Sequence, residues 1–501
     1  MSEADRQPLD RAPEERSGGT PGGTAERVVR NATLKVAVQA TRLASLVLVV
    51  VAARVLGPVE FGKFTFGYAL ATVLGVALEF GVTPVLTRAV ARDPGATAAR
   101  WAAAVTLKVA LLALAGPLYL ALPLLTRRPW DTTAAAWLLG VAIALQAFIE
   151  NGVAIFTGAQ RLEQELRVRL VEKSVLVAAG FAALALGWGL LGVAAAFVLA
   201  AAVSLALTIR LIDRRLARLD ARWDRPAARR LARELAPVAQ ALFLGFATSR
   251  LAPVLVALLA GDVAAGHFGA AFRIYDVVWI VPVTLVAAVY PELARTPATQ
   301  ARFGSLATHA FEALLLVAWP VALGLAVGAP WLVAWVYGPS YAPAAPVLAL
   351  LGAAAACGIL QHFLGVVFLA IDRADRLRTV AALAFGTSAL LTPALVAIGG
   401  AVGGAVSVLV VEAVALVASL AGLWRLGIWP LAGGARKSLG AAVLGALVAG
   451  LLPPGPGRWL GALGAYAGAL LWLRPVPGPM CRRLLRGALG RATPPTAAGE
   501  R

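Results

Sequence analysis

Three arginines lie inside long apolar segments of this sequence: Arg42, Arg250 and Arg273. An arginine near the middle of a membrane costs at least about 2.5–3.5 kcal/mol on insertion scales, so we expect each to face a cavity or a partner rather than lipid. The guanidinium group stays charged in such surroundings, and its planar fork fits the oxygens of a phosphate group. These residues therefore predict a cationic cavity or buried ion pairs within the membrane, and for Arg42, near the start of its segment, a position at the cytoplasmic surface is the alternative.

Two further pairs of charged residues allow alternative interpretations. Asp276 follows Arg273 by three positions, a helical spacing at which an ion pair between them competes with cavity lining by both. Lys108 and Glu312 lie 204 residues apart, at corresponding places of two similar stretches. They are expected either to pair across the cavity or to lie near the membrane surface.

Titratable groups within the apolar segments are candidates for carrying protons. Glu150 and His362 correspond at an offset of 212 residues, and a carboxylate and an imidazole are able to carry protons. Glu150 lies near the end of its segment, where an interfacial position is the alternative. Glu412 lies in the middle of its segment and is the third candidate.

The elements that must position these residues are membrane-spanning helices. Apolar residues make up 60% of the 501 residues and charged residues 14%, and apolar runs of about eighteen residues recur, the length that crosses a bilayer as a helix. Alternating segments typical of a membrane β-barrel are absent from the sequence. The predicted fold is all-α and polytopic, with about fourteen helices near 34–54, 62–82, 102–123, 133–156, 170–188, 190–209, 235–260, 267–290, 306–328, 346–370, 378–398, 401–424, 438–453 and 458–474.

Half of the chain repeats the other half. Gly62-Lys63-Phe64 matches Gly266-His267-Phe268 at an offset of 204 residues, and Gly189 matches Gly400 at an offset of 211. Each half holds six predicted helices, an even number, so both halves enter the membrane from the same side. We therefore expect the halves to be related by a pseudo-two-fold axis along the membrane normal, with a cavity between two similar bundles. This arrangement is typical of transporters.

The distribution of charge predicts the orientation. The net charge is +19, but the basic residues do not gather on one soluble face as nucleic-acid binding would require. With the N-terminus in the cytoplasm, cytoplasmic segments receive 35 basic residues and external loops five, which is the positive-inside pattern with both termini cytoplasmic. The five external ones are Arg54, Lys63, Arg127, Arg128 and Arg458.

Composition also divides the chain into segments. The predicted segments are a disordered cytoplasmic tail over 1–30, a six-helix bundle over 31–209, a basic cytoplasmic linker over 210–234, a second six-helix bundle over 235–425, an appended helical hairpin over 426–474 and a basic cytoplasmic tail over 475–501. The linker is expected to contact anionic lipid head groups. The hairpin has no counterpart in the duplication.

Three stretches resemble bacterial oligosaccharide flippases of the polysaccharide transport family, within the multidrug/oligosaccharidyl-lipid/polysaccharide exporter superfamily. Residues 53–92 are similar to that family's first helical hairpin, residues 265–295 to its eighth helix, and residues 336–352 to the entry of its tenth. The resemblance implies transport of lipid-linked oligosaccharides, typically on undecaprenyl pyrophosphate, from the cytoplasmic to the periplasmic leaflet of the bacterial inner membrane. Glycosyltransferases and a polysaccharide polymerase would be its partners.

With this substrate class, Arg42, Arg250, Arg273, Asp276 and Lys108 are the predicted substrate-binding residues, and Glu412, Glu312, Glu150 and His362 the coupling candidates. No cofactor or metal site is predicted. A cation-coupled multidrug exporter of the same superfamily remains the alternative, although it would favour buried acids over buried arginines. A membrane-embedded glycan polymerase or ligase is the third possibility, but the external loops are short and carry no acid/base pair for transfer chemistry.

Overall fold

A computed structural model of the chain describes residues 21–216, 223–297, 299–429, 433–453 and 455–473. This part of the chain is helical and holds no β-strand, so the predicted fold class is confirmed. Its helices are α1 (Pro21–Glu79), α2 (Val82–Arg92), α3 (Thr97–Leu125), α4 (Trp130–Gly158), α5 (Leu162–Ala185), α6 (Gly189–Arg215), α7 (Arg225–Leu259), α8 (Gly261–Val278), α9 (Ile280–Arg295), α10 (Ala301–Tyr337), α11 (Ala344–Ala370), α12 (Ala374–Trp424), α13 (Gly433–Leu451) and α14 (Pro456–Leu473), with 3-10 turns at Pro94–Ala96 and Pro339–Tyr341.

The division of the chain into helices differs in part from the prediction. Within the described ranges, eight helical segments are long and apolar enough to cross a membrane. Two of them, Leu43–Arg92 and Ala374–Trp424, each contain two predicted spans, because α1 reverses at Gly57 and α12 at Gly400, where the backbone leaves the helical conformation. The span predicted at 267–290 is broken at Trp279 into α8 and α9.

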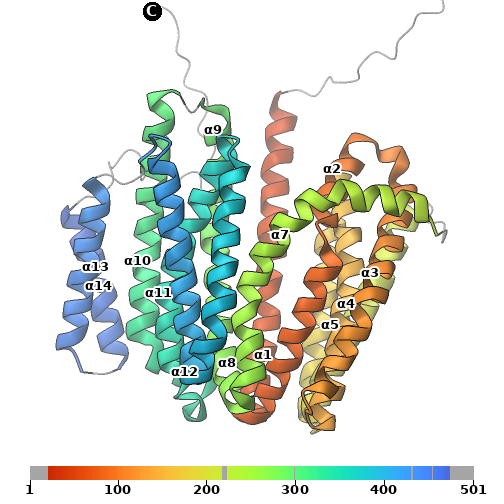
Figure 1. Ribbon diagram of the computed structural model, residues 1–501, viewed down its shortest axis with the longest axis horizontal. Coiled ribbons are helices and arrows are strands. Elements are labelled where there is room, and N and C mark those ends of the chain that lie inside the picture. The colour runs from red at the N-terminus through yellow and green to blue at the C-terminus, as the bar shows by residue number, and fades with distance from the viewer. Residues whose placement is uncertain (1–20, 217–222, 298, 430–432, 454, 474–501) are drawn as a thin grey trace, which may run out of the picture.

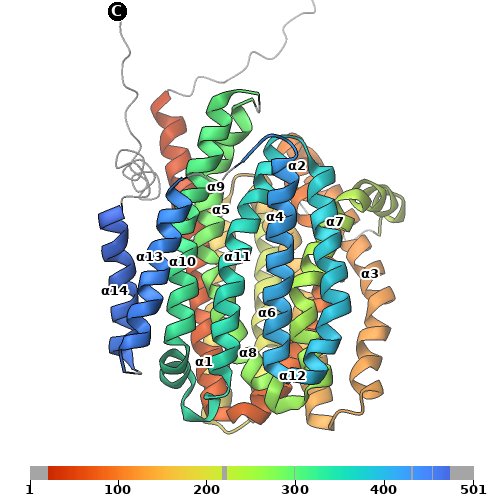
Figure 2. The same ribbon diagram turned by 60° about the vertical axis from the view of Figure 1, so that its left-hand side comes forward.

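The helices form two groups with further helices between them (Figure 1). On one side lie α2 to α5 with the second part of α1, and on the other lie α10 to α12. The first part of α1, together with α7 and α8, runs between the groups, and α13 and α14 lie at the outer edge beside α10 (Figures 1 and 2). The reversals of α1 and α12 lie at the same end of the bundle, which we call the Gly57 end.

The duplication read from the sequence is repeated in the backbone. Gly57 and Gly261, 204 residues apart, have φ angles of 75° and 82°. Gly189 and Gly400, 211 residues apart, have φ angles of 57° and 54°. Such left-handed conformations are accessible to glycine at little cost. The two halves are therefore pseudo-symmetric, and the same turns reverse the chain at equivalent places.

Several boundaries lie earlier than the sequence indicated. α1 begins at Pro21 instead of 31 or later, and α5 begins at Leu162 instead of near 170. Most of the predicted linker is helical too, because α6 continues to Arg215 and α7 starts at Arg225. These helix ends consist of polar and charged residues, so a search for apolar segments does not include them. They are helical because a helix already formed gains one hydrogen bond for each residue it adds. The tail predicted at 475–501 lies outside the described residues.

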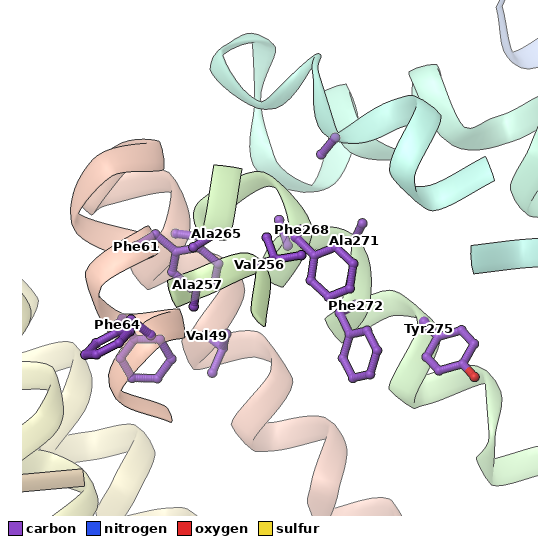
Figure 3. Close-up of a cluster of buried hydrophobic side chains, with 14 of the residues drawn as sticks. Val49, Phe61, Phe64, Val256, Ala257, Ala265, Phe268, Ala271, Phe272 and Tyr275 are labelled. Carbon is purple, nitrogen blue, oxygen red and sulfur yellow. The ribbon is translucent and has the colours of Figure 1, made fainter. Parts of the chain in front are cut away.

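At the Gly57 end the two halves join through a shared apolar core, part of which Figure 3 shows; Phe61 and Phe64 of α1, Val256 of α7 and Phe268 and Phe272 of α8 are among its members. Two glycines permit the close approach. A Cβ added at Gly62 would lie 1.7 Å from the carbonyl oxygen of Asp262, and one added at Gly266 would lie 2.1 Å from that of Pro58. Gly62 thus contacts the residue four positions before Gly266, and Gly266 contacts the residue four positions before Gly62. A two-fold axis between the halves requires such reciprocal contacts. We call these four residues the glycine crossing.

The appended hairpin is tied to the second half by a buried carboxylate. Glu312 of α10 is 4% exposed, and its Oε1 accepts a hydrogen bond of 2.9 Å from the backbone N–H of Gly434 in the first turn of α13. The indole N–H of Trp459 in α14 donates to the carbonyl oxygen of Gly324 in α10 at 2.9 Å. A negative charge at a helix N-terminus is stabilising, so Glu312 caps α13.

The variant Glu312→Ala should loosen this hairpin. It leaves a buried N–H without its acceptor, which costs about 1–3 kcal/mol, and Glu312→Gln should lose less because an acceptor oxygen remains. The thermal midpoint of the purified protein in detergent measures the effect. Glu292→Ala is the control, since Glu292 is an exposed carboxylate paired with Arg302. A midpoint for Glu312→Ala no lower than that of the control would show that the cap contributes nothing.

Candidate functional site

A cavity of about 750 Å³ lies between the two halves, within the size range of ligand sites. Both halves contribute to its wall, as the duplication predicts. The residues that line it are Ser45, Leu46, Val49, Tyr68, Lys173 and Phe197 from the first half and Gly245, Phe246, Ser249, Arg250, Phe272, Arg273, Tyr275, Asp276, Val277, Trp279, His362 and Glu412 from the second.

Two of the predicted arginines face this cavity. The guanidinium of Arg273 lies over the ring of Tyr68 in the opposite half, 4.1 Å from the ring centroid. Arg250 lies 6.0 Å from the centroid of Phe272, and its Nη1 is 3.8 Å from Oδ2 of Asp276. Asp276 therefore pairs with Arg250 rather than with Arg273, the neighbour on its own helix. Among the described residues, the contacts of Arg250 and Arg273 with Phe272, Asp276 and Tyr68 use only some of the five N–H donors of each guanidinium group, which leaves others for a ligand.

Lys173 in α5 is a cavity residue that the sequence did not indicate. Its Nζ lies 2.6 Å from Oε1 of Glu172, and its side chain is 20% exposed. The predicted helix near 170–188 put Lys173 in its first turn, and its charge was counted with the cytoplasmic segment. Because α5 begins at Leu162, Lys173 lies three turns into the helix, on the wall formed by the first half. The residues before Lys173 are largely polar, so the sequence did not show how far Lys173 lies from the start of the helix.

Lys108 and Glu150 belong to a buried network of the first half and do not line the cavity. Lys108 is fully buried; its Nζ lies 3.5 Å from Oε2 of Glu79 and donates to the carbonyl oxygen of Ala147 at 2.6 Å. Glu150 accepts from Arg169 at 2.7 Å. These contacts satisfy the charges within one bundle.

The remaining predicted positions lie apart. Glu312, expected to pair with Lys108 or to lie near the surface, instead caps α13 in the second half. Glu150, paired with Arg169, and His362, in the cavity wall, lie in different bundles, as their places in the two halves predict; coupling by either residue stays a prediction. Arg42 is in α1, and its side chain lies outside the described part of the structure.

Glu412 and His362 both line the cavity from the second half. The ring of His362 meets that of Trp279 edge-on, with centroids 6.0 Å apart. Both side chains are partly exposed to the cavity, which a coupling group would require. Their predicted role in coupling stays a prediction.

Contacts between the halves close the cavity at the Gly57 end. Besides the glycine crossing, Arg128 of the first half forms an ion pair of 2.6 Å with Asp262 of the second and lies over the ring of Phe66. Arg54 donates to the carbonyl oxygen of Val336 at 2.6 Å. Tyr341 donates from its hydroxyl to the carbonyl oxygen of Ala53 at 2.8 Å in the other half. These groups form a polar seal around the apolar core.

Solved structures of helical transporters share this fold. One is described as the lipid II flippase MurJ in an inward closed conformation: it has 13% identity and a TM-score of 0.74, covering 91% of this chain and 100% of that one. An inward-facing multidrug resistance MATE family transporter of the MOP superfamily has 16% identity and a TM-score of 0.53, covering 80% and 98%. A MOP superfamily transporter from Pyrococcus furiosus has 15% identity and a TM-score of 0.53, covering 82% and 96%. Comparison of the sequence with curated proteins returns no match.

Two pseudo-symmetric bundles around a central cavity define a multi-pass membrane protein with the fold of MOP superfamily transporters. A family model described as polysaccharide biosynthesis protein matches residues 28–296, which are 269 of the 501 residues. The chain belongs to this family of polysaccharide biosynthesis proteins.

Proposed function

We propose that this protein moves a lipid-linked oligosaccharide, of the undecaprenyl-pyrophosphate type, from the cytoplasmic to the periplasmic leaflet for cell-surface polysaccharide synthesis. The observation that carries the proposal is the cationic cavity between the halves, with Arg250, Arg273 and Lys173 in its wall. Such a substrate joins an anionic diphosphate and a hydrophilic glycan to a long apolar tail. The head group needs a wet, cationic space, whereas the tail can remain in lipid.

The direction of transport follows from orientation. The positive-inside pattern favours cytoplasmic termini, which puts the Gly57 end on the periplasmic side. A cavity closed at that end would take up substrate from the cytoplasmic leaflet. Opening of the seal at Arg128 and the glycine crossing would release the substrate to the periplasmic leaflet. Rocking of the two bundles about their shared axis is the motion that this symmetry favours.

A multidrug exporter of the same superfamily is the second candidate, since structures of such exporters share the fold. The described lining of the cavity holds three strongly basic side chains and two acidic ones, Asp276 and Glu412. A site for organic cations would favour the reverse balance, so a lipid-linked anion fits better. We infer a transporter rather than an enzyme, working beside the glycosyltransferases and the polymerase that make and consume its substrate.

The test replaces Arg250 and Arg273 separately by alanine and follows lipid-linked oligosaccharide in the two leaflets of proteoliposomes. Each substitution should slow translocation about 10- to 100-fold, because a hydrogen bond to a charged group contributes about 1.5–3 kcal/mol. Arg→Lys at either position should retain part of the activity, since lysine keeps the charge but loses the planar fork.

Arg302→Ala serves as the control, because Arg302 is 73% exposed and lies outside the cavity. Normal translocation by both alanine variants, with the protein inserted in wild-type amounts, would refute the cationic site. Transport of a cationic dye instead of the lipid-linked sugar would favour the exporter.

A further inference from the structure

Besides its cations, the cavity has a wall of aromatic and polar side chains. Trp279 lies at the junction of α8 and α9, His362 on α11 and Glu412 on α12. The rings of Tyr275 and Trp279 meet edge-on with centroids 6.3 Å apart, and His362 meets Trp279 in the same way. Figure 3 shows Tyr275 with its hydroxyl pointing away from the apolar core. This wall comes entirely from the second half.

A glycine brings the carboxylate and the indole together. A Cβ added at Gly358 on α11 would lie 2.7 Å from a ring carbon of Trp279 and 3.1 Å from Oε2 of Glu412. The indole of Trp279 and the carboxylate of Glu412 therefore both pack against the α11 backbone at Gly358, in the space that a larger side chain would fill. An apolar ring face and a hydrogen-bond acceptor are thus placed side by side.

No cation of the described part of the chain lies beside Glu412. Arg250 is paired with Asp276, and Lys173 with Glu172. Among the described residues, no ion pair or hydrogen bond is formed by the carboxylate of Glu412, although it lines the cavity. When ionised, this carboxylate only accepts hydrogen bonds, so it offers acceptors to the hydroxyl groups of a ligand.

We propose that Trp279, His362 and Glu412 form a sugar subsite that selects a first sugar without negative charge and disfavours a uronic acid. This inference rests on the proposed function, in which the diphosphate occupies the arginines. The C–H face of a pyranose ring packs on the negative face of an indole, and its hydroxyls donate to Glu412 and bond with the imidazole. A sugar carboxylate beside Glu412 would instead meet a like charge, which is how a site rejects a wrong ligand.

The experiment measures binding to the purified full-length protein in lipid nanodiscs. Three probes are used: undecaprenyl diphosphate alone, and the same lipid bearing N-acetylglucosamine or glucuronic acid. The N-acetylglucosamine lipid should bind about tenfold or more tightly than the glucuronic acid lipid, the size of one like-charge contact. Glu412→Gln should abolish this preference by strengthening the binding of the glucuronic acid lipid.

Trp279→Ala should weaken the binding of both sugar-bearing lipids and leave the affinity for undecaprenyl diphosphate unchanged. Trp279→Phe should retain part of the affinity that the sugar adds. Trp335→Ala is the matched control, because Trp335 is 65% exposed outside the cavity and should alter none of the three affinities. Equal affinities for the two sugar lipids, or a preference for glucuronic acid, would overturn the subsite alone. Failure of undecaprenyl diphosphate itself to bind would overturn the proposed function, and the subsite with it.

Discussion

Replacing Gly62 by alanine is expected to force open the Gly57 end of the bundle. The new methyl group would lie 1.7 Å from the carbonyl oxygen of Asp262 and 2.5 Å from its carbonyl carbon, and these are backbone atoms that no rotamer change can move away. Overpacking a tight core costs about 1–3 kcal/mol, and a clash with backbone belongs at the upper end. About 3 kcal/mol shifts an equilibrium roughly 100-fold, so the population should move toward an arrangement that is open at this end.

Distances between nitroxide labels measure this shift. Cysteines placed at Thr126 and Ser340 lie on opposite halves at the Gly57 end, in a background with both native cysteines replaced by serine. Gly62→Ala should move the distance distribution to longer values. Gly266→Ala should do the same, because its methyl group would lie 2.1 Å from the carbonyl oxygen of Pro58.

Gly75→Ala is the control on the same helix. A Cβ at Gly75 would meet only a side-chain carbon of Ile143, at 2.9 Å and within the first half. Its distance distribution should stay that of the unsubstituted protein. If Gly62→Ala and Gly75→Ala gave the same distribution, the glycine crossing would not hold the halves together.

The sequence predicted the symmetry of the fold well because the duplication preserves turns. Gly189 and Gly400 were paired on offset alone, and the backbone shows them in the same left-handed conformation. The offset also paired Gly62 with Gly266, but nothing in an offset indicates that the two copies touch. That contact depends on how the bundles close, which is a tertiary property.

The charged positions were predicted less completely. Depth within an apolar segment identified Arg250 and Arg273, because an exposed arginine there is too costly. Partners could not be read in this way: helical spacing indicated an Arg273–Asp276 pair, and the partner of Asp276 is Arg250 on α7. Lys173 was missed because its helix starts in a polar run.

Corresponding positions of the two halves have different tasks. Lys108 is neutralised inside the first bundle, whereas its counterpart Glu312 holds the appended hairpin against the second. The polar and aromatic wall with Trp279 and Glu412 belongs to the second half alone. A symmetric fold can rock, but a lipid-linked sugar has different ends, and only an asymmetric cavity can bind each of them.

Arg169 gives the largest stability effect that we expect. It lies between two carboxylates, 2.7 Å from Glu150 and 3.1 Å from Glu172, and only 15% of its side chain is exposed. Arg169→Met would leave Glu150, whose side chain is 29% exposed, without its cation. Breaking a buried ion pair from one side costs about 3–5 kcal/mol, and the partial exposure of Glu150 places the loss at the lower end of that range.

The double variant Glu150→Gln with Arg169→Met should recover most of this loss. Glutamine removes the orphaned charge, and Glu172 keeps Lys173 at 2.6 Å. The thermal midpoint of the purified protein should therefore fall strongly for Arg169→Met and be largely restored in the double variant. A double variant as unstable as the single one would mean that arginine acts through packing and not through the charge of Glu150.

Arg302→Met tests whether the loss of stability depends on the burial of the ion pair or only on its short N–O distance. Arg302 lies 2.6 Å from Glu292, as close as any pair in the buried network, but its side chain is 73% exposed. Exposed ion pairs contribute about 0–1 kcal/mol, since water solvates either charge when the other is removed. The same substitution at this surface site should therefore barely lower the thermal midpoint. A loss there equal to that of Arg169→Met would assign the effect to the loss of the arginine side chain itself and not to the burial of the abandoned carboxylate.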